Sequence, residues 1–180
     1  TMCLALLVAA GCDEPKQSVI TAVADGPQWE VTVAFVEGND TSGVQVLVPG
    51  ASDFAGWEGG KPIISGSRIK TGPKARTRIA LESGEVILNH DTIVELVPDV
   101  SRSLRLHQGH AVFDLTGAPE RKIQLPTGEL VLLGTKLSAV ADAKQSVVTV
   151  SQGVVEARHG EQSVKARAGQ EIIIPDEGEM

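Results

Sequence analysis

Apolar and polar residues alternate in short runs along most of the chain, a spacing typical of half-buried strands. The clearest run is 125–140, where apolar residues recur at nearly every second position. Gly128 and Gly134 interrupt it, and we expect turns or bulges there because glycine lacks a Cβ. Outside residues 2–10, no window of ten or more residues has helical periodicity. The pattern predicts an all-β fold.

The alternation divides the chain into predicted strands spaced about ten residues apart. These strands comprise 29–36, 44–48, 68–71, 76–82, 85–89, 92–97, 103–107, 110–115, 146–151, 154–158, 164–167 and 172–174. We expect breaks or tight turns at Ser83-Gly84, Gln108-Gly109 and Gln152-Gly153. Regular hairpins of this kind indicate a single antiparallel domain, built as a sandwich, a jelly roll or a short β-solenoid.

The longest irregular segment is 49–62, which is rich in glycine and holds Trp57. A loop of this length inside a compact domain is often functional or mobile. Trp57 either covers the end of the sandwich or offers a platform for a ligand. We therefore take this segment as the candidate binding loop.

Composition and charge narrow the classes of function. A chain of 180 residues fits one domain, and a core of this size buries roughly 70% of the unfolded surface. With 3% aromatic residues and no Tyr, the core must be built mainly from Val, Ile, Leu and Ala, which favours sheets. The net charge of −7 and the pI near 5.1 argue against nucleic acid as a partner.

The N-terminal segment predicts export and lipidation. Residues 2–10 are apolar but too short to span a bilayer, which takes about 20 residues, so they resemble the hydrophobic region of an export signal. The sequence Ala9-Ala10-Gly11-Cys12 resembles a bacterial lipobox, except that Ala9 stands where Leu is usual. An incidental cysteine in a buried element is the alternative. We expect 1–11 to be the remnant of a signal peptide and Cys12 to carry lipid.

This interpretation sets the expected domain organisation and location. Cys3 would leave with the signal peptide, so no free thiol or disulfide would remain. We expect 12–28 to be a tether, 29–175 the folded domain and 176–180 an acidic, solubilising tail. Two or three acyl chains anchor a protein stably, which predicts a periplasmic protein held at the inner or outer membrane of a Gram-negative-type cell. Asp13 resembles an inner-membrane retention signal, but this rule is not universal.

Short segments in a fixed order resemble the FecR domain. They comprise 66–72 (Gly66-Ser67-Arg68-Ile69-Lys70-Thr71-Gly72), 75–84, Asp91-Thr92, 104–113 around Gly109, Thr127-Gly128, Gly134-Thr135, 148–154 around Gly153, and Ala168-Gly169-Gln170. The likeness covers nearly all of 29–174.

The resemblance implies an all-β periplasmic domain without catalytic residues. Its best-known members relay the state of an outer-membrane transporter to a cytoplasmic sigma factor, which a segment preceding a transmembrane helix binds. Here a lipobox stands in place of that helix, and the chain ends at Met180, soon after the last predicted strand. We therefore expect a protein-binding envelope module that does not itself hold a sigma factor.

Three histidines raise the question of a metal site. His107 and His110 flank Gln108-Gly109, with Asp114 nearby, and across a tight hairpin the two rings could approach each other. A zinc site needs three or four converging ligands, and only His90, distant in sequence, could supply a third imidazole. We expect solvent-facing histidines and no bound metal.

Motifs for nucleophilic or phosphate chemistry are missing from the sequence. It has no Gly-x-Ser-x-Gly, and Pro62 follows Lys61 where a phosphate loop needs Ser or Thr. The carboxylate pairs Asp13-Glu14 and Asp176-Glu177 lie in the predicted tether and tail, where no pocket would raise a pKa. We expect no enzyme activity and no cofactor.

Binding another protein requires less specialised chemistry than catalysis or metal binding. An open sheet leaves unpaired N–H and C=O groups on its edge strands, to which a partner strand can add. The sequence therefore favours a non-catalytic adaptor, scaffold or signalling module that contacts another envelope protein. A cell-wall glycan-binding module is the alternative, and it would need Trp57 exposed beside polar side chains.

Overall fold

A computed structural model describes residues 30–37, 43–98, 102–177 and 180. The strands are β1 (Glu30–Glu37), β2 (Val44–Leu47), β3 (Ala55–Gly56), β4 (Ile63–Ile64), β5 (Arg68–Thr71), β6 (Arg76–Leu81), β7 (Gly84–Leu88), β8 (Ile93–Leu96), β9 (Leu104–Leu115), β10 (Arg121–Leu125), β11 (Gly128–Ala141), β12 (Gln145–His159), β13 (Gln162–Arg167) and β14 (Glu171–Pro175). The predicted all-β class is confirmed. Nothing in these ranges is a helix long and apolar enough to cross a membrane.

The fourteen strands form one hydrogen-bonded sheet that folds over into two layers. In the first layer the order is β13-β12-β11-β10-β9-β8-β5-β2-β3. In the second layer it is β14-β12-β11-β9-β7-β6-β1-β4. Every pairing is antiparallel except that of β9 with β10, where Leu104 stands opposite Ile123. The architecture is a sandwich with open edges.

Three long strands belong to both layers and hold them together. The first half of β11 pairs with β10 and its second half with β9. In β12 the first half pairs with β14 and the second half with β13. In β9 the first half pairs with β8 and the second half with β7. A strand that serves both layers must bend in its middle.

Glycine allows one of these bends. Gly134 in β11 has a φ of 58° and Gly153 in β12 a φ of 84°, values that side chains with a Cβ rarely adopt. The register of the two strands shifts between Leu133 and Lys136. A Cβ on Gly153 would lie 2.9 Å from the carbonyl oxygen of Gly134. The predicted bulge at Gly134 is therefore confirmed.

The predicted breaks at Gln108-Gly109 and Gln152-Gly153 are wrong. Both dipeptides lie within long strands, β9 and β12, near the points where those strands pass from one layer to the other. A bulge interrupts the alternation of apolar residues just as a turn does, so the sequence pattern cannot separate the two. Elsewhere the predicted strands correspond closely, and 68–71 coincides with β5.

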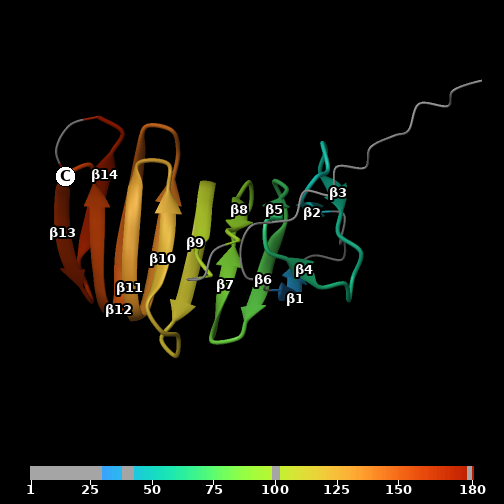
Figure 1. Cartoon of the computed structure of the whole chain (residues 1–180), viewed down its shortest axis with the longest axis horizontal. Coiled ribbons are helices and arrows are strands. Elements are labelled where there is room, and N and C mark those ends of the chain that lie inside the picture. The colour runs from blue at the N-terminus through green and yellow to red at the C-terminus, as the bar shows by residue number, and fades with distance from the viewer. Residues whose placement is uncertain (1–29, 38–42, 99–101, 178–179) are drawn as a thin grey trace, which may run out of the picture.

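Alternate residues of both layers are buried in one continuous aliphatic core. Phe113 on β9 is the largest fully buried side chain, and Leu, Ile, Val and Ala make up the rest. The molecule is elongated across its strands, with β13 and β14 at one end and β1 to β4 at the other (Figure 1). Each end therefore offers a surface far from the other.

Candidate functional site

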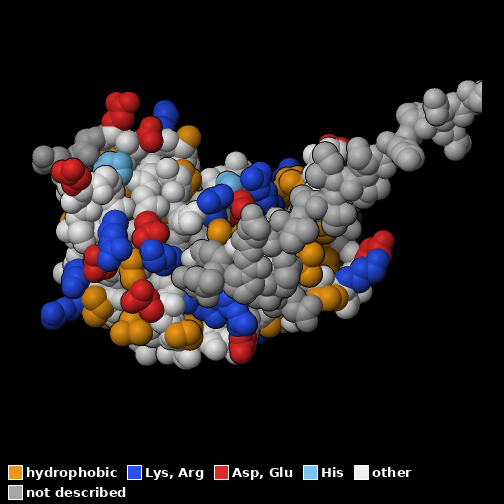
Figure 2. Space-filling model, in the orientation of Figure 1, with side chains coloured by type: hydrophobic (Ala, Val, Ile, Leu, Met, Phe, Trp, Pro, Cys, Tyr) orange, Lys and Arg blue, Asp and Glu red, His pale blue; other side chains and the backbone are white. Residues whose placement is uncertain are grey.

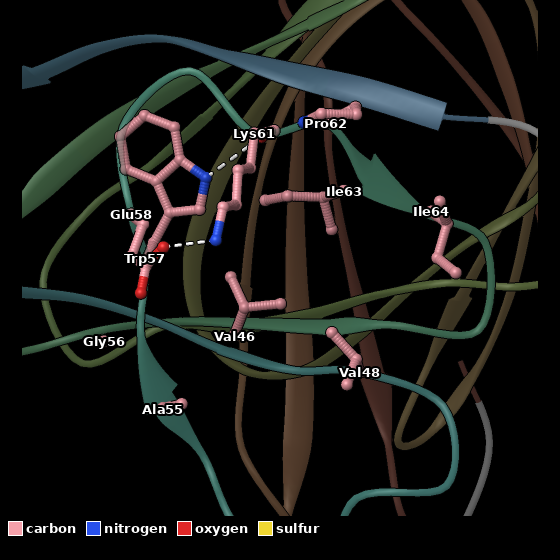
Figure 3. Close-up of a pocket in the computed structure, with 10 residues that line it drawn as sticks. All are labelled: Val46, Val48, Ala55, Gly56, Trp57, Glu58, Lys61, Pro62, Ile63 and Ile64. Atoms are coloured by element: carbon pink, nitrogen blue, oxygen red, sulfur yellow. Dashed lines mark hydrogen bonds and ion pairs between the residues drawn. The ribbon is translucent and has the colours of Figure 1, made fainter.

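An open pocket of about 320 Å³ lies at the end formed by β2, β3 and β4. Figure 3 shows the residues that line it, which are Val46, Val48, Ala55, Gly56, Trp57, Glu58, Lys61, Pro62, Ile63 and Ile64. Most of them belong to the predicted binding loop, 49–62, or lie just beside it. The prediction that this segment is mainly irregular is confirmed, since β3 is its one strand.

Neighbouring strands hold the loop in place. β3 pairs with β2, and the backbone N–H of Trp57 donates to the carbonyl of Val44 at 2.9 Å. The ammonium group of Lys70 on β5 lies 5.6 Å from the centre of the Phe54 ring, a favourable cation–π distance. The loop is therefore tied to the first layer on both sides of β3.

Trp57 covers this end of the sandwich. Its ring packs against the hydrophobic core, and its indole N–H donates to the carbonyl of Lys61 at 3.2 Å. The side chains of Glu58 and Lys61 form an exposed ion pair at the rim (Figure 3). Because the indole N–H already has a partner, Trp57 offers a ligand mainly its apolar surface.

The rest of the pocket is aliphatic. Val46 and Ile63 are buried at its floor, whereas Val48 and Ile64 are 50% and 43% exposed. Such a lining suits an apolar side chain better than a sugar, whose hydroxyl groups need polar partners. The sequence analysis did not predict Val48 and Ile64 as binding residues. Ile63 and Ile64 are adjacent in a strand, however, so one of their side chains must point outward.

The three candidate metal ligands lie apart, each with a polar partner. His107 and His110 stand on one strand, β9, so the expected hairpin between them is wrong. Nε2 of His107 lies 2.7 Å from Glu95, Nε2 of His110 lies 2.8 Å from Ser138, and Nδ1 of His90 lies 3.0 Å from Asp91. Asp114 pairs with Lys136 at 2.8 Å. Within the described ranges no three His, Cys, Asp or Glu side chains form a group that could hold a metal.

A charged cluster crosses the outer face of the first layer, centred on Glu95. The carboxylate lies 3.1 Å from Arg68, 3.4 Å from Arg105 and 2.7 Å from His107. Burial alone would raise the pKa of Glu95, but the hydrogen bond with His107 and the charges of Arg105 and Arg68 outweigh it and lower that pKa. The group stays ionised near neutral pH, which suits an ion-pair network and not an acid catalyst.

Mixed charge of this kind extends over the surface. On the face drawn in Figure 2, Lys and Arg side chains are interspersed with Asp and Glu side chains. Glu156, Arg158 and Glu129 continue the pairing on the first layer, with distances of 2.8 and 3.8 Å. Charges paired in this way leave little free potential to attract a strongly charged ligand.

The lipidation site predicted at Cys12 lies outside the described residues, and so does Trp29, the predicted first residue of the strand that the structure describes from Glu30 as β1. The described part of the acidic tail, Asp176 and Glu177, is exposed. Met180 contacts the core, and its backbone N–H donates to the side chain of Gln162 at 3.0 Å.

Two solved structures share this architecture. Both are crystal structures of a candidate anti-sigma factor from Parabacteroides distasonis. They match with TM-scores of 0.54 and 0.53 and 19% sequence identity, over 61% of this chain and 55% of the other. The chain thus spans about half the length of these structures, and at this identity the likeness concerns the fold. No curated protein matches the chain.

Residues 67–156 match the FecR protein family. This range, half of the 180 residues, runs from the start of β5 into β12 and builds the middle of the sandwich. It is shorter than the likeness expected over 29–174, because β1 to β4, β13 and β14 lie beyond it. It nevertheless contains Asp91-Thr92, Gly109 and Gly134-Thr135 in the order that the resemblance requires. The chain belongs to the FecR family.

Proposed function

We propose that this chain is a non-catalytic adaptor in a signalling assembly of the cell envelope. In this proposal the pocket at the β2–β4 end receives an apolar side chain of a protein partner. The observation that carries it is the open, aliphatic lining of that pocket, where Val48 and Ile64 face solvent. A lipid on Cys12 would keep the domain at a membrane.

The family supports a regulatory role. FecR proteins act in signalling and not as enzymes, and the solved structures with this fold are of a candidate anti-sigma factor. Such proteins work by contacting other proteins. A protein partner therefore fits this chain better than a small substrate.

The pocket has the features of a protein-binding hot spot. Hot spots place one large apolar side chain in a dehydrated pocket, surrounded by a polar rim. Here the walls are aliphatic, Trp57 forms one side, and the ion pair of Glu58 and Lys61 lies at the rim. Fully burying one Leu-sized or Phe-sized partner side chain would contribute about 1.5–3 kcal/mol.

Photo-crosslinking in intact cells tests the proposal. A photoreactive residue at position 48 or 55 should give one dominant protein adduct, identified by mass spectrometry. With the probe at position 55, Ile64→Asp should remove that adduct, because a charge in the pocket opposes an apolar side chain. Leu133→Asp, an exposed apolar position outside the pocket, serves as the matched control and should leave the adduct unchanged. Glycan adducts, or none, would overturn the proposal, the former in favour of a cell-wall module.

Membrane attachment has its own test. Cys12→Ser should move the protein from the membrane pellet to the soluble fraction, since the thiol would be the point of acylation. A variant that stays in the pellet would contradict lipid anchoring at Cys12, and it would leave the pocket proposal intact.

A further inference from the structure

The end of the sandwich opposite the pocket carries an open edge strand, β14. Among the described strands it pairs with β12 alone. At one end of this pairing the backbone N–H of Asp176 donates to the carbonyl of Lys144 at 2.8 Å. Residues that bond to the neighbouring strand alternate with residues that do not along an antiparallel ladder. The backbone groups of Glu171, Ile173 and Pro175 therefore point away from β12, toward the open edge.

The centre of this edge lacks the usual protection against strand addition. Edge strands commonly carry a lysine or a proline that blocks pairing with another strand. On β14 only Pro175, at one end, is such a residue, and the middle position is Ile173. On the neighbouring edge strand, β13, the backbone N–H of Arg167 already donates to the side chain of Gln170 at 2.8 Å. The outward N–H groups of β14 therefore remain open to a further strand.

The backbone of β14 is self-complementary about Ile173. If two copies paired antiparallel at this residue, the two Ile173 residues would exchange both of their N–H···O bonds. Glu171 of each copy would stand opposite Pro175 of the other, so its N–H could donate to that carbonyl. Proline has no N–H to return, but the carbonyl of Glu171 lies near the end of the strand, where water can reach it. A second copy thus uses every outward N–H of the edge.

The apolar side chains beside the edge also match themselves. Val140, Val147 and Ile173 stand next to one another across β11, β12 and β14 in the register of the sheet. Val140 is 48% exposed and Ile173 52%. A twofold axis at the edge would set the two Ile173 side chains side by side and join the two rows into one apolar stripe. Apolar pairs across neighbouring strands stabilise a sheet.

Charges of opposite sign lie at the two ends of β14. Arg167 is exposed, makes no ion pair with any described residue, and is held beside the start of β14 by its hydrogen bond with Gln170. Asp176 and Glu177 are exposed at the other end. In the antiparallel register Asp176 of one copy would stand opposite Gln170 of the other, and thus near Arg167. The chain therefore supplies both halves of an ion pair at each end of the interface.

The second layer and the net charge do not oppose this arrangement strongly. The strands β13 and β14 lie at the same end of the molecule (Figure 1), so the two β13 strands would also approach each other. Lys165 on β13 lies 3.9 Å from Glu156, so each lysine brings an anion with it. The net charge of −7 is screened beyond about 8 Å at physiological ionic strength. Contacts at the edge itself therefore dominate.

We infer that β14 is a dimerisation edge, and that its occupant is a second copy of this chain paired antiparallel about Ile173. Twofold contacts in which both subunits use the same surface are the commonest in soluble homo-oligomers. The pocket lies at the other end of the elongated molecule (Figure 1), so the dimer would present two pockets at its far ends. The edge and the pocket share no residue, and this inference does not rest on the proposed function.

Self-association of the purified full chain tests the inference. Sedimentation equilibrium should show a monomer–dimer equilibrium, under reducing conditions so that Cys3 and Cys12 cannot link copies. In ¹⁵N-labelled protein, hydrogen exchange at the amides of Glu171 and Ile173 should slow as the protein concentration rises. A chain that stays monomeric up to about 1 mM, or a dimer without protection of these two amides, would overturn the inference.

Two variants at the centre of the edge locate the contact. Ile173→Pro removes an N–H that the fold does not use, and it should abolish dimerisation. Ile173→Lys sets two lysines side by side at the axis, should weaken dimerisation at least tenfold, and serves if the proline variant does not fold. Val48→Asp, at the opposite end, is the matched control and should dimerise like the unaltered chain. Equal association of these variants and the unaltered chain would contradict a contact at β14.

A charge exchange tests the register. Arg167→Asp and Asp176→Arg should each weaken dimerisation about tenfold, because like charges would then meet at both ends of the interface. A mixture of the two single variants should recover most of the lost affinity, because each supplies the charge that the other requires. Failure of the mixed variants to associate better than either alone would refute the antiparallel register about Ile173.

Crosslinking in intact cells separates a second copy from any other occupant of the edge. A photoreactive residue at position 171 should give an adduct with another copy of the chain. An adduct with a different protein in its place would overturn the inference in favour of a foreign strand. None of these outcomes bears on crosslinking from positions 48 and 55 at the pocket.

Discussion

The ionisable side chains of this sandwich mostly contact one another, and His110 shows what this does to a titration. Burial lowers the pKa of His110, and the nearby charges of His90 and Arg76 lower it further. In the neutral ring Nδ1 accepts a hydrogen bond from Asn89 at 2.7 Å, and Nε2 donates to Ser138 at 2.8 Å. A second proton on the ring would break the contact with Asn89.

We therefore predict that His110 makes stability sensitive to mild acid. Its pKa is lower in the folded state than the ordinary value of 6.5, so below that value the unfolded chain binds the proton more readily. The contribution of His110 is thus fully present above pH 6.5 and declines as the pH falls through the lower folded value. In His110→Gln the free energy of unfolding should fall less between pH 7.5 and pH 5.5. Urea unfolding at both pH values measures the difference.

The unaltered chain and His110→Gln are compared at the same pH, so that the contributions of the other titratable groups, which both proteins contain, cancel in the difference. His159→Gln is the matched control, because His159 is hydrogen-bonded to the backbone carbonyl of Thr127 and is not among the charges that act on His110. An equal loss of stability in His110→Gln and the unaltered chain would contradict the assignment of a neutral, hydrogen-bonded ring.

At the scale of elements, three long strands pass through both layers. A sequence interpreted as a series of short hairpins does not predict strands of this length. β11 and β12 stay paired from Ala141 and Ser146 at one end to Glu129 and Arg158 at the other. Their shared bulge turns both strands from one layer into the next. The two layers can share one core because these strands continue through the bend.

The bulge gives a direct prediction. Gly134→Val should destabilise the sheet by about 1–3 kcal/mol, because a β-branched residue would have to adopt a positive φ. Urea unfolding, followed by circular dichroism, measures the change. Gly117→Ala is the control, since a Cβ there meets no atom within 4 Å, and it should alter stability by less than about 1 kcal/mol. An unchanged midpoint in Gly134→Val would refute the role of this glycine.

At the scale of the whole molecule, one core runs from the pocket end to the β13–β14 end. The cluster includes Val46 and Ile63 beneath the pocket as well as Ala166 and Ile172 on the edge strands. A continuous core of this kind favours cooperative unfolding. The pocket end and the β13–β14 end therefore share one continuous core.

We expect this body to unfold in a single transition. The chain has two tryptophans, so in a Trp29→Phe variant the fluorescence reports on Trp57 at the pocket end. Circular dichroism reports on the whole sheet. The two urea transitions should have the same midpoint within error. An earlier fluorescence transition would mean that the loop and β2–β4 form a separate, weaker unit.

Much of the fold can be read from the sequence alone. Apolar residues alternate with polar ones in the strands because each strand must bury one face. This alternation predicts the strand at 68–71 and the irregular segment around Trp57. Composition determines an aliphatic core. The order of short glycine-containing segments, such as 66–72 and Gly134-Thr135, identified the family. All of these patterns involve residues that are close together in the sequence, so the sequence alone shows them.

The pairing of strands was decided only by the tertiary structure. Gln108-Gly109 and Gln152-Gly153 break the local pattern as turns would, and only contacts with β8 and β11 show that the strands continue. The same holds for the candidate surfaces. Whether Val48, Ile64 or Ile173 is exposed depends on which strand lies beside it, and whether an N–H is free depends on which neighbour is absent. Those facts arise from residues distant in sequence, so no local pattern contains them.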